Sequence, residues 1–326
     1  MARVPSPQTQ IEMYRRMALI KRNDEHSQRI IKSGQIAAPY YSPRGQEVIP
    51  AAVSVNLSDH DYICTIYRGT HDMLAKGVPL KDLWAEIAGR IDGTSKGKGG
   101  PMHITHPKSG CMVTTGVVGS SMPIANGLAW ASQLSEDGRV TVAYFGDGAS
   151  NIGAFHESLN LAALWKLPVV FVCQNNQYGE HTAYAKATSA TRIADRAVSY
   201  AMPGVRADGN DPFEMYSVAG EAIERARAGG GPTLIEAMTF RFNGHLLGDA
   251  DGYMDKTRKK DAMEADPVPR YRARLIADGV ALEEQLLEIE ARVDRDIREA
   301  IEFALASPYP DLIELRRDVY ADEIDE

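Results

Sequence analysis

The 326-residue sequence lacks the features that mark several large classes of protein. Its longest basic run is Arg258-Lys259-Lys260, and the formal net charge is −8, which argues against nucleic acid as the main partner. No apolar run approaches the roughly 20 residues that span a bilayer. The first residues, MARVPSPQTQIEMYRRM, contain no hydrophobic signal core. We therefore expect neither a nucleic acid partner nor a membrane partner.

Cysteine is scarce as well. The three cysteines, Cys64, Cys111 and Cys173, are widely spaced and form no CxxC pair, so the sequence indicates neither a disulfide framework nor a zinc site. Hydrophobic residues make up 44% and charged residues 25% of the chain, which is the ordinary composition of a globular protein. These observations predict a soluble protein of the reducing cytoplasm.

What the sequence does contain is a regular alternation of short apolar runs with helical stretches between residues 44 and 240. The apolar runs are 61–67, 140–145, 168–173 and 233–240. They are nearly continuous in their hydrophobicity, which is typical of parallel strands covered on both faces. The helical candidates between them are 120–134, 151–165 and 212–228. The pattern predicts an α/β fold with a doubly wound, mostly parallel sheet.

Further helices are expected on either side of this region, over 8–33 and 281–306. Between the sheet region and the second of these helices, residues 243–270 are polar and show little periodicity, so they predict a long surface loop. The expected organisation is an N-terminal helical arm (1–43), an α/β domain (44–242), an active-site loop (243–270) and a C-terminal helical segment packed on the same domain (271–326).

An acidic residue, Asp147, stands between two glycines directly after an apolar run, in YFGDGASN. A helix over 151–165 is about 22 Å long, and a return strand over 167–174 is about 26 Å long. Because the two lengths nearly cancel, we expect Asn175 and Asn176 to return to the edge of the sheet that Asp147 left. Open α/β sheets bind their ligands at this carboxyl edge.

The residue types at this edge indicate what kind of ligand is bound. Carboxylate and amide oxygens suit Mg²⁺ or Ca²⁺, and a glycine turn that leads into a helix suits phosphate oxygens. A Gly-Asp-Gly alone or an Asn pair alone is more often a simple turn. Together, at a spacing that one strand–helix–strand unit explains, they predict a metal-bridged diphosphate site.

Longer motifs strengthen this interpretation. They are YRGTHDMLAKG (67–77), GKGGPMH (97–103), GVVGSSMPIANG (116–127), the GDG and NN pair within 140–179, and PTLIEAMTFRFNGHLLGD (232–249). In this order they resemble the alpha subunit of the thiamine-dependent dehydrogenase component of 2-oxo acid dehydrogenase complexes, of the pyruvate and acetoin type. The resemblance extends from about residue 10 to 270.

The resemblance implies a cofactor, thiamine diphosphate with Mg²⁺, and assigns a first group of residues to its metal and diphosphate. Asp147 and Asn176 would bind Mg²⁺ through their side chains, and Tyr178 would bind it through its carbonyl oxygen. Gly148 and Ala149 would present backbone N–H groups to the diphosphate.

A second group would complete the site. Tyr67 and Arg68 would bind the outer diphosphate oxygens, to which the planar fork of an arginine is well suited. Gly116 and Val118 would offer backbone contacts to the aminopyrimidine ring. His245, on the loop, would lie above the diphosphate and the reacting carbon and serve as the catalytic residue.

Other positions receive no cofactor role. Members of the family often carry a histidine where this chain has Thr70, and His71 follows it, so a histidine role at this place is left open. Gln174 stands where the pyruvate-type pattern usually has an acid. Glu157 and Asn160 are expected to pack inside the helix that covers the sheet.

The resemblance also implies a reaction and partners. The chain would cleave a 2-oxo acid such as pyruvate by oxidative decarboxylation and pass the acyl group to a lipoyl-bearing acyltransferase. The carboxylate that activates the aminopyrimidine ring would come from a beta subunit in an α₂β₂ heterotetramer, because this chain has no room for a second α/β domain.

Several alternatives stay open at this point. A structural subunit whose site has decayed is the one that the intact Asp147, Asn176 and Arg68 argue against. Acetoin is the alternative substrate, since an acetoin dehydrogenase alpha subunit fits the same motifs. A split transketolase-like enzyme usually shows a GDGE turn and lacks a GHxxxD loop, whereas this chain has GDGA and GHLLGD. A non-catalytic metal–nucleotide module is a further alternative, and a titration of thiamine diphosphate against ATP would distinguish it.

Overall fold

The computed structural model describes residues 3–319, and its centre is a six-stranded sheet in which all neighbouring strands are parallel. The strand order is β2-β1-β3-β4-β8-β7. The strands are β1 (Tyr62–Ile66), β2 (Cys111–Thr115), β3 (Thr141–Gly146), β4 (Val169–Asn175), β7 (Gly204–Asp208) and β8 (Thr233–Met238), with a separate hairpin of β5 (Tyr178–Gly179) and β6 (Thr182–Ala183).

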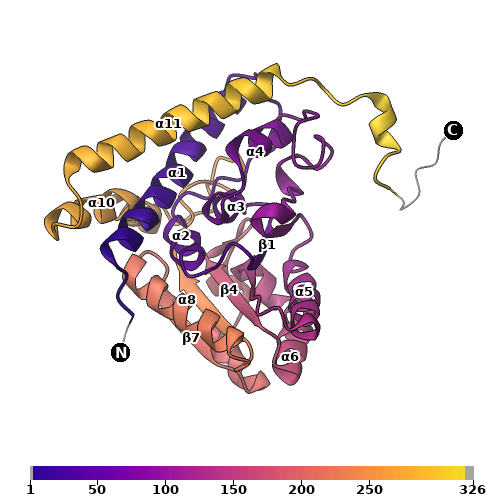
Figure 1. Ribbon diagram of the computed structural model, residues 1–326. Coiled ribbons are helices and arrows are strands. Elements are labelled where there is room, and N and C mark those ends of the chain that lie inside the picture. The colour runs from indigo at the N-terminus through magenta and orange to yellow at the C-terminus, as the bar shows by residue number, and fades with distance from the viewer. Residues whose placement is uncertain (1–2, 320–326) are drawn as a thin grey trace.

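Helices cover both faces of this sheet (Figure 1). The α-helices of the described chain are α1 (Pro7–Lys32), α2 (Val48–Ser54), α3 (Thr70–Lys76), α4 (Leu80–Ile87), α5 (Ser121–Ser135), α6 (Gly153–Trp165), α7 (Tyr184–Ala187), α8 (Pro212–Arg227), α9 (Lys256–Glu264), α10 (Pro267–Ala277) and α11 (Glu283–Ala306). The 3-10 helices are η1 (Gly100–Met102), η2 (Pro107–Ser109), η3 (Asp147–Asn151), η4 (Ala194–Tyr200) and η5 (Leu312–Leu315).

The two faces of the sheet belong to two separate hydrophobic cores. Along β3, Val142 and Tyr144 lie in the core with α1, α2, α3 and α8, whereas Ala143 and Phe145 lie in the core with α5 and α6. This division follows from the alternation of side chains along a strand. It explains why the central strands are apolar at nearly every position, and it confirms the predicted doubly wound α/β fold.

The two long helices at the ends of the chain lie together in an outer layer (Figure 1). Helix α1 begins after Ser6, whose side chain accepts a hydrogen bond from the Thr9 backbone N–H. Tyr14 on α1 donates to Glu290 on α11 over 2.5 Å, and His26 on α1 lies 3.1 Å from Asp294. Both helices are confirmed close to their predicted bounds. None of the helices within residues 3–319 is long and apolar enough to cross a membrane.

The structure corrects the prediction of an irregular loop over 243–270. The irregular part ends at Asp255, which caps α9 by accepting the Thr257 and Arg258 N–H groups. Helix α10 then begins at Pro267 after Asp266, another N-cap residue. Both N-cap aspartates are present in the sequence, but they stand in a polar stretch with little periodicity. The proposed division of the chain into four parts stays a prediction.

Three further differences have local causes. The apolar runs do not predict strands β2 and β7. Both lie at the edges of the sheet, and their sequences, CMVTT and GVRAD, mix polar with apolar residues, so neither shows the continuous apolar run of the other strands. The helix predicted to begin at Asn151 begins at Gly153, because Asp147 opens the 3-10 turn η3.

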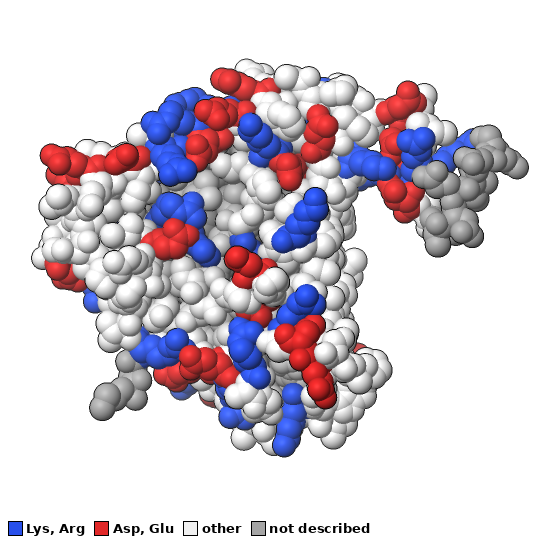
Figure 2. Space-filling model, viewed as in Figure 1, with Lys and Arg blue, Asp and Glu red and all other residues white. Residues whose placement is uncertain are grey.

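Acidic and basic side chains are intermingled on the face of the molecule shown in Figure 2, with no large patch of one sign. After α11, the chain continues as a narrow segment that extends away from the body (Figure 1).

Candidate functional site

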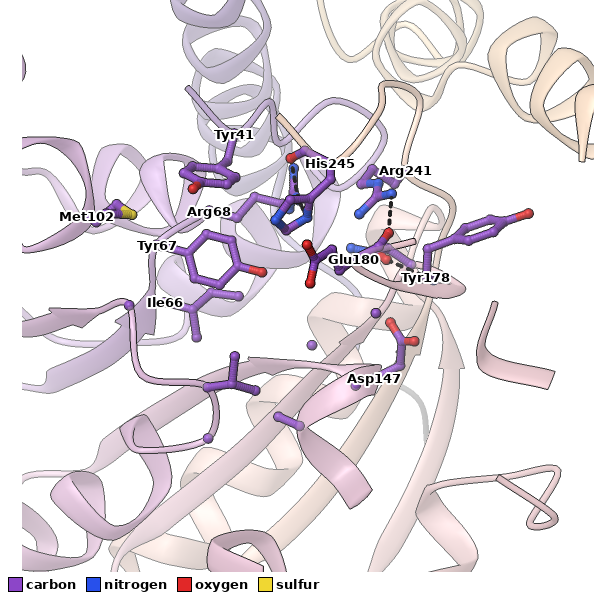
Figure 3. A pocket seen from close by; sticks show the side chains of 18 residues that line it. Tyr41, Ile66, Tyr67, Arg68, Met102, Asp147, Tyr178, Glu180, Arg241 and His245 are labelled. Carbon is purple, nitrogen blue, oxygen red and sulfur yellow. Dashed lines mark hydrogen bonds between the residues drawn. The ribbon is translucent and has the colours of Figure 1, made fainter. Parts of the chain in front are cut away.

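One cavity of about 430 Å³ opens at the carboxyl edge of the sheet (Figure 3). Strand β1 lies between β2 and β3, so the chain winds first to one side and then to the other. Ligands bind at such a switch point in open α/β sheets. Every residue that the sequence assigned to the site lines this cavity: Tyr67, Arg68, Gly116, Val118, Asp147, Gly148, Ala149, Asn176, Tyr178 and His245.

Asp147 lies directly after β3 and is only 1% exposed. Its Oδ1 atom is buried and has no hydrogen-bond partner among the described residues. Burial raises the pKa of Asp147 to about 7, because an ionised carboxylate is disfavoured away from water. An unpartnered buried carboxylate oxygen that faces a cavity is suited to a bound cation.

Backbone surrounds this carboxylate closely. The first N–H groups of a helical turn have no partner within the turn, and those of η3 belong to Asp147, Gly148 and Ala149. A Cβ atom on Gly148 would lie 3.2 Å from Cα of Gly179, and a Cβ atom on Gly179 would lie 3.2 Å from Cα of Gly148. The two glycines therefore line a concave surface of bare backbone, which fits an anion that must approach N–H groups closely.

The two asparagines at the end of β4 point in different directions. The register pairs Gly146 with Gln174, so the end of β4 does return beside Asp147 as predicted. Asn175 donates over 2.8 Å to Glu236 on β8 and does not line the cavity. Asn176 lines it, with Oδ1 accepting from the Tyr178 N–H over 3.2 Å. The Asn176 oxygen is thus the amide oxygen available near Asp147.

Two buried arginines lie across the cavity from Asp147 (Figure 3). Arg68 is 3% exposed and Arg241 is 1% exposed, and neither forms an ion pair within residues 3–319. Burial, followed by the charge of Arg241, lowers the pKa of Arg68 to about 10. Buried cations without acidic partners are costly, so this wall of the cavity is suited to an anionic ligand.

His245 is held over the same wall. Arg68 Nη2 donates to the His245 carbonyl oxygen over 2.9 Å and lies 3.3 Å from Nδ1. Since arginine has no acceptor, Nδ1 is the acceptor and the ring proton lies on Nε2. Burial, together with the charge of Arg68, lowers the pKa of His245 to about 4, so the ring is neutral at pH 7. The Asp249 carboxylate fixes the loop by accepting from the His245 N–H over 2.6 Å.

The side of the cavity next to β2 is different in character. Gly116 and Val118 follow β2, and Met102 reaches the cavity from η1. None of these residues is ionisable. Val118 is 48% exposed, and its neighbour Val117 is also exposed, so apolar surface continues from the cavity to the outside of the molecule.

His71 does not belong to the cavity. It is fully buried, and its Nε2 lies 3.1 Å from Oε1 of Gln174. Gln174 in turn donates to Asp72 over 2.7 Å, so the polar residue in place of the family's acid belongs to an internal network. Glu157 and Asn160 were expected to pack, and this expectation is wrong for the chain as described, because both are exposed on α6.

Sequence reasoning missed several residues of the cavity wall. Arg241 follows β8, the strand next to β4, so the argument that placed Asn176 at the carboxyl edge would have placed Arg241 there too. Glu180 stands beyond β5, and Tyr41 and Met102 come from segments outside the sheet. No periodicity or spacing in the sequence marks these last three residues.

Comparisons with known proteins agree with the geometry. A family model described as "Dehydrogenase E1 component" matches residues 15–313. The alpha subunit of acetoin:2,6-dichlorophenolindophenol oxidoreductase from Bacillus subtilis (strain 168) is 42% identical over 309 residues, covering 94% of this chain and 92% of that protein. The pyruvate dehydrogenase E1 component subunit alpha is 36% identical in Porphyra purpurea, over 95% of this chain and 92% of that one. The Rhizobium meliloti subunit is also 36% identical, over 96% and 90%.

Proposed function

The chain belongs to the dehydrogenase E1 component family, and on this basis we propose that it is the alpha subunit of a thiamine diphosphate-dependent 2-oxo acid dehydrogenase. The observation that carries the proposal is the buried, unpartnered Asp147 oxygen opposite two buried arginines in one cavity. That arrangement fits a metal-bound diphosphate, with the cation beside Asp147 and the phosphate oxygens toward Arg68 and Arg241.

Magnesium is the cation that these donors fit. The described residues contain no group of three His, Cys, Asp or Glu side chains that could hold a metal ion. A cation beside Asp147 therefore needs further oxygens, which the Asn176 side chain, the Tyr178 carbonyl group and the diphosphate itself would supply. An all-oxygen set shared with phosphate is typical of Mg²⁺.

The remaining residues of the cavity would bind and orient the cofactor. Gly148 and Ala149 would donate backbone N–H groups to the diphosphate, and Arg68, Arg241 and Tyr67 would contact its outer oxygens. Thiamine diphosphate, when bound, supplies the carbon nucleophile for cleavage of the bond next to the substrate's carbonyl group.

The role of His245 follows from its protonation state. The ring is neutral, its Nδ1 accepts from Arg68, and its Nε2 carries the proton. We propose that the Nε2–H group of His245 donates a hydrogen bond to an oxygen of the substrate or cofactor, so that its proton is directed at that oxygen. Asp249 would keep this donor aimed by fixing the backbone of the loop.

A beta subunit would complete the β2 side of the cavity. The acidic side chains that line the cavity, Asp147 and Glu180, come from the segments after β3 and β4, so within residues 3–319 no cavity-lining carboxylate lies beside Gly116 to activate an aminopyrimidine ring. Helix α5 has no charged residue at all. Its outer face and that of α6 expose large apolar side chains, namely Ile124, Trp130, Leu134, Leu164 and Trp165. We propose this surface as the beta subunit's docking site in an α₂β₂ heterotetramer.

The substrate and the acceptor are the finer parts of the proposal. The named functions of the relatives include both pyruvate and acetoin oxidation. A pyruvate-like 2-oxo acid is proposed first, and the 42% identical acetoin relative supports acetoin as the second candidate. The acyl group would pass to a lipoyl-bearing acyltransferase. Three free, buried cysteines support the proposed location in a reducing cytoplasm.

A substrate screen tests the proposal. The chain is purified with its beta subunit, loaded with thiamine diphosphate and Mg²⁺, and assayed with an artificial electron acceptor against pyruvate, branched 2-oxo acids and acetoin. Turnover of one of these substrates is expected. In parallel, thermal stability is measured with thiamine diphosphate or ATP, each with Mg²⁺. Stabilisation by ATP alone would instead support the metal–nucleotide module.

A further inference from the structure

The segment 93–103, GTSKGKGGPMH, connects α4 to the region before β2 and forms part of the cavity wall. Met102 lines the cavity directly. A Cβ atom on Gly116 would lie 3.6 Å from the ring of His103, so the end of this segment also covers the residue proposed to contact the aminopyrimidine ring. A stretch so rich in glycine has few side chains with which to hold its own conformation.

One carboxylate organises this segment from inside. Glu86, in the last turn of α4, is fully buried. Its Oε2 accepts from the backbone N–H groups of Ser95 and Gly97 over 2.6 and 2.9 Å. Its Oε1 accepts from those of Gly99 and Gly100 over 2.8 and 3.0 Å. A carboxylate has about four lone-pair sites, so backbone donors occupy all of them.

The glycines allow this close wrapping. A Cβ atom on Gly93 would lie 2.5 Å from Oε2 of Glu86. On Gly97, which has φ +74°, it would lie 2.5 Å from the backbone carbon of Gly89, and on Gly99 it would lie 2.5 Å from the His103 carbonyl oxygen. The segment is therefore not a loose hinge. Its conformation requires both the small residues and the acceptor at its centre.

A second set of contacts holds the outer side of the segment. Lys98 lies 2.8 Å from Asp318, and Lys96 lies 3.1 Å from Glu314. The lysine side chains are substantially exposed, and exposed ion pairs contribute little. Hydrogen bonds from backbone N–H groups to a buried charged acceptor are stronger and are costly to leave unmade. Glu86 is therefore the dominant anchor.

We propose that Glu86 is a positioning residue for the cofactor cavity, one that holds 93–103 so that Met102 and His103 keep their places on its β2 side. Apart from the single 3-10 turn η1, the segment gains its order from one buried carboxylate instead of from a strand or an α-helix. The inference rests on the proposed function for the identity of the ligand, thiamine diphosphate with Mg²⁺. The anchoring itself is a property of the chain alone.

The test compares Glu86→Gln with the unchanged protein. The substitution keeps the volume of the side chain but leaves one acceptor oxygen and turns an NH₂ group toward two N–H donors. Amide hydrogen exchange is expected to become at least about tenfold faster across 93–103, because one lost hydrogen bond to a charged acceptor is worth about that factor. Exchange in β3 and β4 should stay the same. Unchanged exchange in 93–103 would overturn the proposal.

Calorimetric titration with thiamine diphosphate and Mg²⁺ provides the link to the cavity. Glu86→Gln is expected to weaken binding about tenfold or more, whereas Glu288→Gln, at an exposed position on α11, is expected to leave it unchanged. Lys98→Ala should speed exchange by less than about threefold. Faster exchange with unaltered affinity would mean that Glu86 has only a structural role.

Two further results separate this inference from the proposed function. If Glu86→Gln does not fold, Glu86→Asp retains the charge but withdraws both oxygens by one methylene, and faster exchange confined to 93–103 is again expected. If the unchanged chain and its beta partner bind no thiamine diphosphate, the proposed function fails. The exchange measurements then still support or refute anchoring by Glu86.

Discussion

The two sides of the cavity differ sharply. The side formed after β3 and β4 carries a buried carboxylate, an amide oxygen and bare glycine backbone, and Arg68 and Arg241 face it. The side after β2 offers Gly116, Val118 and Met102, with the His103 ring nearby and no carboxylate among the described residues that line it, and its apolar surface continues outward. The first side is the one that fits the proposed metal-bound diphosphate. The second supplies shape but no carboxylate.

This difference teaches that a binding site is not the same as a catalytic site. The β3–β4 side is preorganised by the sheet register, and it is expected to bind the polar end of a cofactor in the chain by itself. The β2 side lacks a group that activates the other end. Chemistry is therefore expected only where a second polypeptide covers the β2 side.

The largest effect is expected from removing that polypeptide. The purified chain alone should show negligible oxidation of 2-oxo acids with an artificial electron acceptor, because no carboxylate is available beside Gly116. Adding the beta subunit should restore turnover in proportion to the complex formed. Full turnover by a rigorously pure alpha chain would contradict the comparison of the two sides.

A smaller but still large effect is expected from Asp147→Asn, on the β3–β4 side of the cavity. The substitution keeps the volume of the side chain and removes its charge. Binding of Mg²⁺ and thiamine diphosphate should therefore weaken by at least about 10–100-fold, which is the loss typical of residues that only hydrogen-bond a metal ligand. Asp59→Asn, at an exposed position, is the matched control. Calorimetry with equal affinities for both variants would refute the metal assignment, provided that Asp147→Asn melts like the parent.

The pH dependence of binding sharpens the same assignment. Burial raises the pKa of Asp147 to about 7, and the metal requires the ionised form. Affinity should level off above about pH 7 and fall by up to about tenfold per unit below it, because protons compete with Mg²⁺. The diphosphate also titrates near this range, so the slope is compared with that of Asp147→Asn, which should be shallower. Identical slopes would count against ionisation of Asp147.

The smallest effect is expected at the loop that carries His245. Residues 243–255 contain no lysine or arginine, so chymotrypsin is the suitable probe, with sites at Leu246, Leu247 and Tyr253. Cleavage is expected to slow several-fold when thiamine diphosphate and Mg²⁺ are added, as the loop orders over them. Equal cleavage rates with and without the cofactor would argue against ordering of this loop over the cofactor.

The fold and the position of the site followed from local patterns for a physical reason. Apolar strand runs and the nearly equal lengths of helix and return strand are local properties, and they brought Asp147 and Asn176 to one edge. What separates Asn176 from Asn175 is the hydrogen bond of Asn175 to Glu236 on β8. That contact joins residues far apart in the chain, so the residues' own pattern could not choose between the two asparagines.

Other contacts likewise leave no mark in the local pattern of residues. Glu86 was not recognised because its four partners are backbone groups, which leave no trace in the residue types beyond the glycines themselves. Helices α9 and α10 were missed for a different reason. Their N-cap residues Asp255 and Asp266 are present in the sequence, but the surrounding stretch is polar and shows little helical periodicity, which is the pattern of a loop.

The exposed tryptophans of α5 and α6 provide an intrinsic fluorescence signal for assembly. Trp130 and Trp165 are 46% and 42% exposed, and their ring centroids lie 5.2 Å apart. The third tryptophan, Trp84, is fully buried and donates to Asn23. Two of the three indole side chains therefore fluoresce from a solvent-exposed surface. A polypeptide that covered α5 and α6 would shift their fluorescence to the blue while Trp84 stayed constant, so assembly would be visible without any label.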